Sequence, residues 1–248
     1  MKLKKSTLFF YSLAEMPINI ALFPILVFIP KFYTGEMGVP LALAANIILA
    51  VRIFDVFTDP VVGYINDRTN TKWGRRRPWI AIATPLLMVS IYMLFIPPEG
   101  AGALHLFLWM FLLSIGTTML IIPYYAWGAE LSPDYNERSR ITGWRSISGV
   151  VGSLSAQLIP TIALVFFGLG GSTNVLYIVG IASVIIMPIC VFLTVLKVPE
   201  SKDYVQSNIS PIKGFKIMLE NSPFKRLIMA FMFGGIAFSI TIPLYLFF

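Results

Sequence analysis

Residues 52–60 read RIFDVFTDP, within an apolar stretch that runs from Leu41 to Asn66. A stretch of that length and composition predicts a membrane-spanning α-helix. It contains two carboxylates, Asp55 and Asp59, each of which costs at least about 2.5 kcal/mol at bilayer depth. They are one helical turn apart and share a face, and a bound cation or a shared proton would relieve their repulsion. The pair therefore predicts a cation-coupling site in a transporter.

Two further residues of this helix lie close to the aspartates. Arg52 is on the same stripe, so an alternative is an ion pair with Asp55 that only holds helices together, which leaves Asp59 unexplained. Thr58 adds a neutral oxygen nearby, and carboxylate and hydroxyl oxygens suit a hard cation such as Na⁺. Asp55 and Asp59 are metal ligands if the coupling ion is Na⁺. A proton suits them equally, and the sequence leaves the two ions open.

The composition places the chain among membrane proteins with several spans. Hydrophobic residues make up 57% of the chain and charged residues only 12%, against about 25% charged residues in a soluble domain. The net charge is +7, but sixteen of the nineteen Lys and Arg residues lie at the N-terminus or in alternate loops. That distribution is the positive-inside pattern and not a nucleic-acid-binding face. We therefore expect the lipid bilayer, and no nucleic acid, as a partner.

Apolar stretches of about 20 residues, the length that crosses a bilayer, recur along the chain. Six candidates run from Leu8 to Tyr33, Leu41 to Asn66, Trp79 to Ile96, Leu104 to Ala129, Ile141 to Leu169 and Val175 to Leu196. The first follows several lysines without a clear cleavage site, so we expect an uncleaved helix. A seventh begins near Phe224 and still runs at Phe248, as in a chain cut short.

The loop charges indicate how the spans cross the membrane. Lys2, Lys4 and Lys5 precede the first span, and residues 67–78, 132–140 and 197–226 hold most of the other basic residues. The opposite loops carry Lys31 as their one clear positive charge. Because basic loops stay on the cytoplasmic side, we expect a multi-pass protein of the cell (inner) membrane with a cytoplasmic N-terminus.

Sequence signals of an enzyme are nearly absent. The chain has one His and one Cys, and it carries no metalloprotease, hydrolase or P-loop motif. We expect no enzymatic activity and no cofactor beyond a coupling cation. Two alternatives stay open: a membrane enzyme that uses the aspartates as an acid and base pair, and a scaffold in which the carboxylates only pack.

Residues on three other spans are candidates for a substrate cavity. Arg145, near the start of the fifth span, either faces a cavity and pairs with an acidic residue or reaches the cytoplasmic interface. Glu15 and Asn19 are one turn apart on the first span, and either could face the cavity. Tyr125, in an aromatic cluster of the fourth span, either stacks on a sugar ring or belongs to an interfacial belt.

The end of the second span and the loop after it form a further candidate. Gly63, Asp67 and Arg68 end the span, and Arg75 and Arg76 follow in the loop. A carboxylate among several arginines predicts an ionic network that locks helices on the cytoplasmic side and opens as the protein alternates. Positive-inside charge alone is the other explanation, and it leaves Gly63 and Asp67 unaccounted for.

Taken together, these motifs resemble the glycoside–pentoside–hexuronide cation symporters, which include the melibiose permeases. The residues that carry the resemblance are RIFDVFTDP with Gly63, WGRRRPWI at 73–80, PYYAWGAEL at 123–131, and NER at 136–138 with Arg145. The pattern from Gly63 to Arg76 also resembles the loop signature of the wider major facilitator superfamily. The resemblance implies an all-α membrane fold of twelve helices in two halves, with substrate and cation between the halves.

The resemblance also implies how this chain is divided. Residues 1–197 would form the N-terminal six-helix transmembrane bundle, residues 198–223 a cytoplasmic inter-bundle loop, and residues 224–248 an incomplete seventh helix. The C-terminal half of the transporter, if encoded, would then be a partner. The implied activity is secondary active symport of a sugar or glycoside with Na⁺ or H⁺ by alternating access.

The resemblance implies two sets of site residues. The cation-coupling set is Asp55, Thr58, Asp59 and Thr118. The substrate-cavity set is Asn19, Arg52, Tyr125 and Arg145. In the melibiose permeases an aspartate stands at the position of Asn19, a second aspartate at that of Ile121, and a tryptophan at that of Tyr125. These differences argue against a melibiose-like substrate and leave another glycoside, a uronide or an amphipathic lipid-like molecule open.

Overall fold

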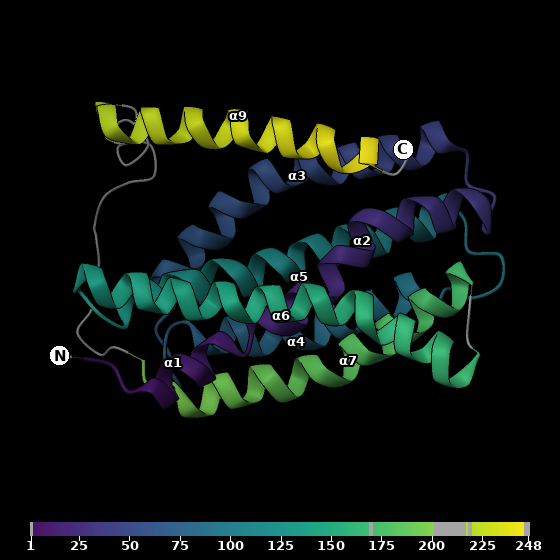
Figure 1. Cartoon of the computed structure of the whole chain (residues 1–248). Coiled ribbons are helices and arrows are strands. Elements are labelled where there is room, and N and C mark those ends of the chain that lie inside the picture. The colour runs from purple at the N-terminus through teal and green to yellow at the C-terminus, as the bar shows by residue number, and fades with distance from the viewer. Residues whose placement is uncertain (1, 169–170, 201–216, 218–219, 246–248) are drawn as a thin grey trace. The chain divides into compact units, whose positions relative to one another are not determined.

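The computed structural model describes residues 2–168, 171–200, 217 and 220–245. The chain divides into two compact units, residues 1–203 and 204–248. In the first unit long helices pack side by side, and the described residues form no strand (Figure 1). The second unit contains one described helix, α9 (Ser222–Tyr245). The predicted all-α class is confirmed.

The helices of the first unit match the apolar stretches of the sequence. They are α1 (Lys5–Ser12), α2 (Glu15–Gly35), α3 (Leu41–Arg68), α4 (Arg77–Phe95), α5 (Ala103–Glu130), α6 (Tyr135–Phe167) and α7 (Ser172–Lys197). Within the described residues, six helical segments are long and apolar enough to cross a membrane, with α1 and α2 counted as one. The six predicted spans are therefore confirmed, but the first is broken into two helices and the fifth begins earlier than predicted.

The first span is divided into two helices, where the sequence analysis expected one. Leu13 and Ala14 separate α1 from α2. Pro17 has no N–H group to donate to the carbonyl oxygen of Leu13, four residues earlier, and the Met16 N–H donates to that oxygen instead, at 3.3 Å. Pro17 lies in the first turn of α2, where a missing N–H is tolerated. Leu13 and Ala14 keep right-handed helical torsions, so the interruption is local.

α6 begins at Tyr135, whereas the predicted span began near Ile141. The Asp134 side chain caps the helix by accepting a hydrogen bond from the Glu137 backbone N–H at 2.9 Å. Arg140 donates to the Glu137 carboxylate at 2.7 Å, one turn further on. The cap and the ion pair thus stabilise the first turns of α6, which contain few apolar residues. Residues 135–140, predicted as loop, are helical for this reason.

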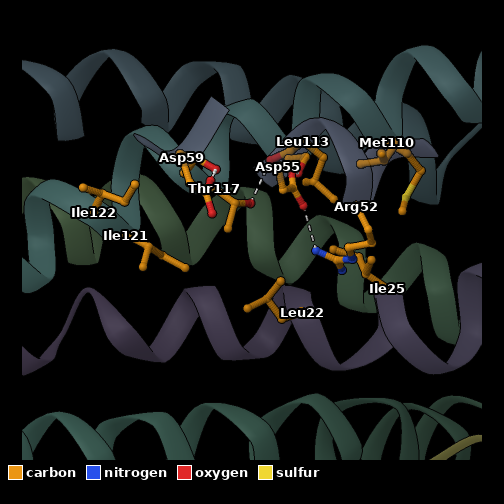
Figure 2. Close-up of a pocket in the computed structure, with 13 residues that line it drawn as sticks. Leu22, Ile25, Arg52, Asp55, Asp59, Met110, Leu113, Thr117, Ile121 and Ile122 are labelled. Carbon is orange, nitrogen blue, oxygen red and sulfur yellow. Dashed lines mark hydrogen bonds and ion pairs between the residues drawn. The ribbon is translucent and has the colours of Figure 1, made fainter. Parts of the chain in front are cut away.

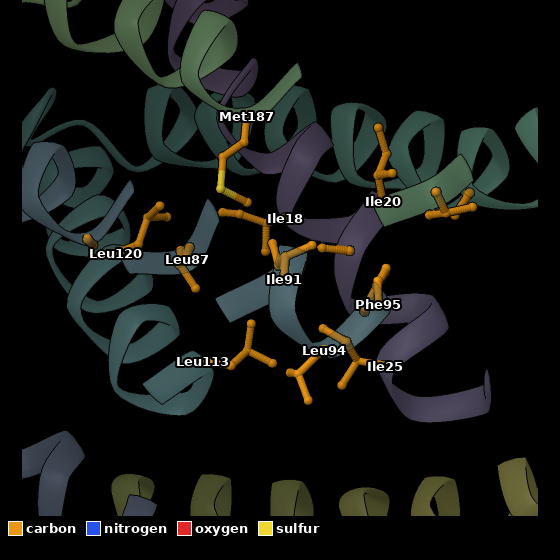
Figure 3. Close-up of a cluster of buried hydrophobic side chains, with 14 of the residues drawn as sticks. Ile18, Ile20, Ile25, Leu87, Ile91, Leu94, Phe95, Leu113, Leu120 and Met187 are labelled. Atoms are coloured by element: carbon orange, nitrogen blue, oxygen red, sulfur yellow. The ribbon is translucent and has the colours of Figure 1, made fainter. Parts of the chain in front are cut away.

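A core of aliphatic and aromatic side chains holds the first unit together (Figure 3). Buried members include Ile18 and Ile25 on α2, Leu87 and Ile91 on α4, and Leu113 on α5. α4 packs along α5 and α7, and α2 packs along α6 and α7. α3 packs mainly on α5, and most of its other side chains are exposed. The face of α3 that carries the aspartates is therefore positioned mainly by α5.

Glycines on α6 allow this helix to approach α2 closely. A Cβ added at Gly152 would overlap the backbone carbonyl oxygen of Met16. A Cβ added at Gly149 would lie 3.2 Å from the Asn19 amide nitrogen and 3.4 Å from the Glu15 Cγ. Small residues at a helix interface permit such backbone contact in membrane bundles. The close approach places α6 directly beside the polar residues of α2.

Candidate functional site

A pocket of about 180 Å³ lies between α3 and α5, and two carboxylates lie on its wall (Figure 2). Asp55 and Asp59 come from α3, and Ser114 and Thr118 come from α5. Leucine, isoleucine, valine and methionine side chains make up most of the remaining lining, some of it contributed by α2. The pocket therefore combines an apolar wall with a short row of oxygen atoms.

Each carboxylate accepts a hydrogen bond from one hydroxyl group. The Thr118 hydroxyl donates to Asp59 Oδ1 at 2.7 Å, and the Ser114 hydroxyl donates to Asp55 Oδ1. Residues four apart share a face of a helix, so the two aspartates match the two hydroxyl residues turn for turn. The register between α3 and α5 thus creates two acid–hydroxyl pairs along the pocket.

Arg52 lies near one end of this row, and its Nη1 is 3.2 Å from Asp55 Oδ2. The Arg52 side chain is 55% exposed and the Asp55 side chain only 18%, so the arginine lies at the edge of the pocket and the carboxylate is the more enclosed partner. Within the described residues Asp59 has no salt-bridge partner. Counting Arg52, Asp55 and Asp59 as ionised, the row carries a net charge of −1, which a cation or a proton can neutralise.

The atoms of the row fit either coupling ion. Two carboxylates and two hydroxyl groups offer only oxygen atoms, which are the ligands that hard cations such as Na⁺ prefer. A proton held by one carboxylate would relieve the same repulsion. Predicted cation-site residues Asp55, Asp59 and Thr118 are thus brought together on one pocket wall.

Thr58 is the one predicted cation-site residue that lies away from the pocket wall. Its hydroxyl donates to the Phe54 carbonyl oxygen of its own helix at 3.2 Å. Neighbouring helical residues point roughly 100° apart, so Thr58 cannot share the face of Asp59. Ser114, which the sequence analysis did not select, lies on the wall instead. Its signal was the spacing of Ser114 and Thr118, one turn apart in an apolar span.

A second polar cluster, the Glu15 cluster (Glu15, Asn19, Tyr125 and Arg145), joins α2, α5 and α6. The Tyr125 hydroxyl donates to Glu15 Oε1 at 3.1 Å, and Arg145 Nε lies 3.9 Å from Glu15 Oε2. The Arg145 guanidinium lies over the Tyr125 ring, 3.9 Å from its centroid, in cation–π geometry. Asn19 Nδ2 donates to the Glu15 carbonyl oxygen at 2.9 Å. Three predicted substrate-cavity residues thus meet around one carboxylate.

Two tyrosines, Tyr11 on α1 and Tyr124 on α5, form a bonded pair beside this cluster. Tyr11 and Tyr124 each donate a hydroxyl hydrogen bond to the other's carbonyl oxygen, at 2.9 and 2.8 Å, and their rings stack with centroids 4.7 Å apart. A Cβ at Gly128 would overlap the Tyr11 hydroxyl, so glycine makes the arrangement possible. The reciprocal bonds fix α1 against α5 next to the Glu15 cluster.

Glu15 is the first residue of α2, directly after the break between α1 and α2. Its carboxylate is accommodated by the Tyr125 hydroxyl group and by the nearby Arg145 guanidinium. Arg52, the fourth residue predicted for the substrate cavity, does not join the cluster and lines the aspartate pocket instead. The sequence analysis considered Glu15 but did not include it in the predicted cavity.

Arg76 is the centre of a third group, the Arg76 network (Asp67, Arg75, Arg76, Glu130 and Glu200), at the end of α3 and in the loop after it. Its guanidinium lies 2.7 Å from Glu130 Oε1 and 2.8 Å from Asp67 Oδ1, and it donates to the Asn66 side chain. Arg75 reaches the same Glu130 oxygen at 2.6 Å. Burial acts to lower the pKa of Arg76, but hydrogen bonds and charges from Glu130 and Asp67 outweigh it and raise that pKa.

Glu200 binds the tight turn in this network. Its Oε1 accepts hydrogen bonds from the backbone N–H groups of Arg75 and Arg76 at 2.6 and 2.7 Å. Gly74 has a φ of +123°, and a Cβ there would overlap the Glu200 carboxylate. Only glycine fits both the torsion and the contact. The chain just after α7 is thus attached to the loop between α3 and α4.

Two of the predicted gate residues lie outside the network. The Arg68 guanidinium lies 4.1 Å from the centroid of the Tyr64 ring. Gly63 faces α5, where an added Cβ would lie 3.8 Å from Ile122 Cγ2. The sequence analysis did not select Glu130 or Glu200. Their signal was an acidic residue at the end of a span, on the side where the loops are basic.

The six membrane-capable helical segments of the described residues are those expected of the N-terminal half of a major facilitator transporter, and α9 comes after them in the chain. The family model described as "MFS/sugar transport protein" matches residues 10–248. The chain therefore belongs to the MFS/sugar transport protein family. This match confirms the resemblance that the second-span and loop motifs carried.

Several curated proteins are similar to the chain. The isoprimeverose transporter of Lactiplantibacillus pentosus is 30% identical over 228 residues, 87% of this chain and 46% of that protein. The putative glycoside/cation symporter YagG of Escherichia coli (strain K12) is 27% identical over 201 residues, 78% and 43% of the two chains. The sodium-dependent lysophosphatidylcholine symporter 1 of Mus musculus is 27% identical over 251 residues, 85% and 47%. The chain spans about half the length of these relatives.

Proposed function

We propose that the transporter to which this chain belongs carries a sugar or glycoside together with Na⁺ or H⁺ by alternating access. The observation that carries the proposal is the row of Asp55 and Asp59 against Ser114 and Thr118, which has an unbalanced negative charge in an apolar pocket. Family membership and relatives named as symporters support the same conclusion. Asp55, Asp59 and Thr118 hold the cation in this proposal.

The substrate would bind at the Glu15 cluster. Asn19, Tyr125 and Arg145 offer an amide, an aromatic face and a guanidinium, which are the groups that bind sugar hydroxyls and stack on sugar rings. About 39% of Tyr125 is exposed, so the cluster is accessible from one side. Relatives named for isoprimeverose and for glycosides support this substrate class.

Alternating access needs a contact on one side of the membrane that closes and opens. The Arg76 network is our candidate for this contact. The Arg75 and Arg76 side chains are largely buried, so separating them from Glu130 and Asp67 is costly unless new partners or water replace these contacts. In this proposal the N-terminus and the loop 67–78 face the cytoplasm of a cell with the protein in its inner membrane. Residues 1–197 form the N-terminal bundle, 198–223 the inter-bundle loop, and 224–248 the start of the second half.

One relative supports a second candidate. The mouse relative is named for lysophosphatidylcholine and for sodium dependence, and it covers as much of this chain as the sugar transporters do. A lipid-like substrate on the same fold is therefore the alternative, and Na⁺ gains some support as the ion. A membrane scaffold that transports nothing is the remaining alternative.

Uptake into vesicles tests the proposal and its alternatives together. The complete transporter is reconstituted and offered isoprimeverose, methyl β-D-glucoside and lysophosphatidylcholine, each with an inward Na⁺ gradient, with an inward proton gradient and with neither. We expect accumulation of a sugar with one of the two gradients. Accumulation of the lipid alone would replace the substrate class, and no accumulation under any condition would favour the scaffold.

A further inference from the structure

We propose that Glu15 selects the substrate by charge: it binds a hydroxyl group of an uncharged glycoside and disfavours a uronide or another anion. The inference rests on the proposed function and makes its substrate class narrower. Glu15 is not among the residues that the family resemblance supplied. It is the carboxylate at the centre of the cluster, and its residue is 9% exposed.

The two carboxylate oxygens of Glu15 differ in their hydrogen bonds. Oε1 accepts the hydrogen bond from the Tyr125 hydroxyl at 3.1 Å. Oε2 is buried and accepts no hydrogen bond from any residue that the structure describes. A buried oxygen of this kind is unfavourable unless a donor reaches it. A ligand hydroxyl is a donor of the right size and polarity.

Arg145 lies near the Glu15 carboxylate without forming a hydrogen bond to it. Its Nε lies 3.9 Å from Glu15 Oε2, which is close enough for charge attraction and too long for a hydrogen bond. The guanidinium is held over the Tyr125 ring, 3.9 Å from the centroid, so this contact competes with a closer approach to Glu15. A hydroxyl group beside both residues could donate to Oε2 and accept from the guanidinium. Sugars present such hydroxyl groups in series.

The charges of Glu15 and Arg145 together determine which ligands the pair favours. Arg145 alone would attract a carboxylate or a phosphate, but Glu15 lies beside it and cancels its charge. An anion that bound Arg145 would also lie within a few ångströms of the buried Glu15 carboxylate. Repulsion between like charges is strong where water is largely excluded. The pair therefore favours a neutral ligand with many hydroxyl groups over an anionic ligand of the same shape.

A purely structural role for Glu15 predicts something different. If the Glu15–Arg145 pair only fastens α2 to α6, its loss would lower stability and affect all substrates alike. If Glu15 selects by charge, its loss changes the preference between neutral and anionic substrates. The ratio of two affinities separates these roles, because a general loss of folded protein cancels in a ratio.

The probes are methyl β-D-glucoside and methyl β-D-glucuronide, which differ only in the group at C6, with isoprimeverose as a second neutral sugar. Each competes for uptake by the complete transporter, as the wild type and as Glu15→Gln, Glu15→Asp and Glu99→Gln. Glu99 is an exposed glutamate between α4 and α5 and serves as the matched control. The half-saturating concentration of the coupling cation is measured in every variant.

We expect the wild type to prefer the neutral sugars over the glucuronide by more than about tenfold, and Glu15→Gln to reduce this preference by about tenfold, as the loss of one charge-assisted contact would. Glu15→Asp keeps the charge and should keep the preference even where binding weakens. Glu99→Gln should resemble the wild type. In all variants the cation requirement should change less than about twofold, because the aspartate pocket is intact.

The inference is overturned if the wild type prefers the glucuronide, or if Glu15→Gln keeps the wild-type preference. It is also overturned if Glu15→Gln does not fold while Glu15→Asp, which keeps the charge, loses the preference. If sugar uptake still depends on a cation in any of these cases, the proposed function stands and only the charge selection fails. If no sugar is taken up or competes with any cation gradient, the proposed function fails as well.

Discussion

The aspartate pocket and the Glu15 cluster are both polar sites inside an apolar bundle, but they balance their charges differently. The aspartate pocket has two carboxylates and one exposed arginine, which pairs with Asp55 only, so a negative charge is left over. In the Glu15 cluster one carboxylate faces one arginine, so the charges cancel. We infer from this comparison that the two sites bind different ligands. In our proposal, the site with surplus charge binds the cation, and the neutral site binds an uncharged substrate.

The largest expected effect is on the aspartate pocket. Asp59→Asn keeps the shape of the side chain and removes the surplus charge, so the Na⁺- or pH-dependent increase in melting temperature of the purified transporter should disappear. We expect cation affinity to fall by more than about tenfold, because a hard cation loses a charged ligand. Under the packing alternative, this variant would keep the cation response and gain stability. An unchanged response would remove Asp59 from the site.

Arg145→Lys tests the other side of the comparison. Lysine keeps the positive charge and loses both the planar guanidinium and its stacking on Tyr125. We expect sugar uptake to weaken by about tenfold, the effect of losing about 1.4 kcal/mol of binding, while the cation-induced stabilisation stays at its wild-type size. Competition binding measures the first quantity and thermal unfolding the second. A loss of both would mean that the two sites are not separable.

A smaller effect is expected at Ser114. Ser114→Ala removes the hydroxyl that donates to Asp55, and we expect a cation affinity about three- to tenfold weaker, which corresponds to the usual net contribution of one hydrogen bond, about 1 kcal/mol. Ser114→Thr restores a hydroxyl group and should recover most of the loss. A variant series in which alanine and threonine bind the cation equally well would show that the hydroxyl is dispensable.

The smallest effect is expected at Thr58. Its hydroxyl bonds within its own helix, and Thr58→Ala should change cation affinity by less than about twofold, as surface-type substitutions usually do. Titration of the cation response in Thr58→Ala and Ser114→Ala side by side compares the two residues directly. The reverse order of effects would restore Thr58 to the cation site.

The spans were predictable because hydropathy and length are local properties, and the six stretches match the helices closely. The start of α6 and the break after α1 were harder to predict from the sequence. The start of α6 depends on the cap formed by Asp134. The break after α1 depends on Pro17, which has no N–H group to donate to the Leu13 carbonyl oxygen. Both are interactions of single groups within a few residues, and an average over a window of residues does not register them.

The sites were partly predictable. Spacing on one helix identified Asp55 and Asp59, their residue types and positions made Tyr125 and Arg145 candidates, and the family resemblance supplied Thr118. The partners on other helices were missed because they depend on register. Ser114 meets Asp55 only through the fit of α3 on α5. Glu200 meets Gly74 only because the chain after α7 returns to the loop between α3 and α4.

The most direct test of the cation site compares two kinds of transport in the complete protein. Asp55→Asn and Asp59→Asn are each expressed at the level of the wild type, and both cation-driven accumulation and exchange of substrate at equilibrium are measured. We predict that both variants lose accumulation and keep at least part of the exchange, because the Glu15 cluster is intact. Wild-type accumulation in both variants would contradict the assignment of the aspartate pocket as the coupling site.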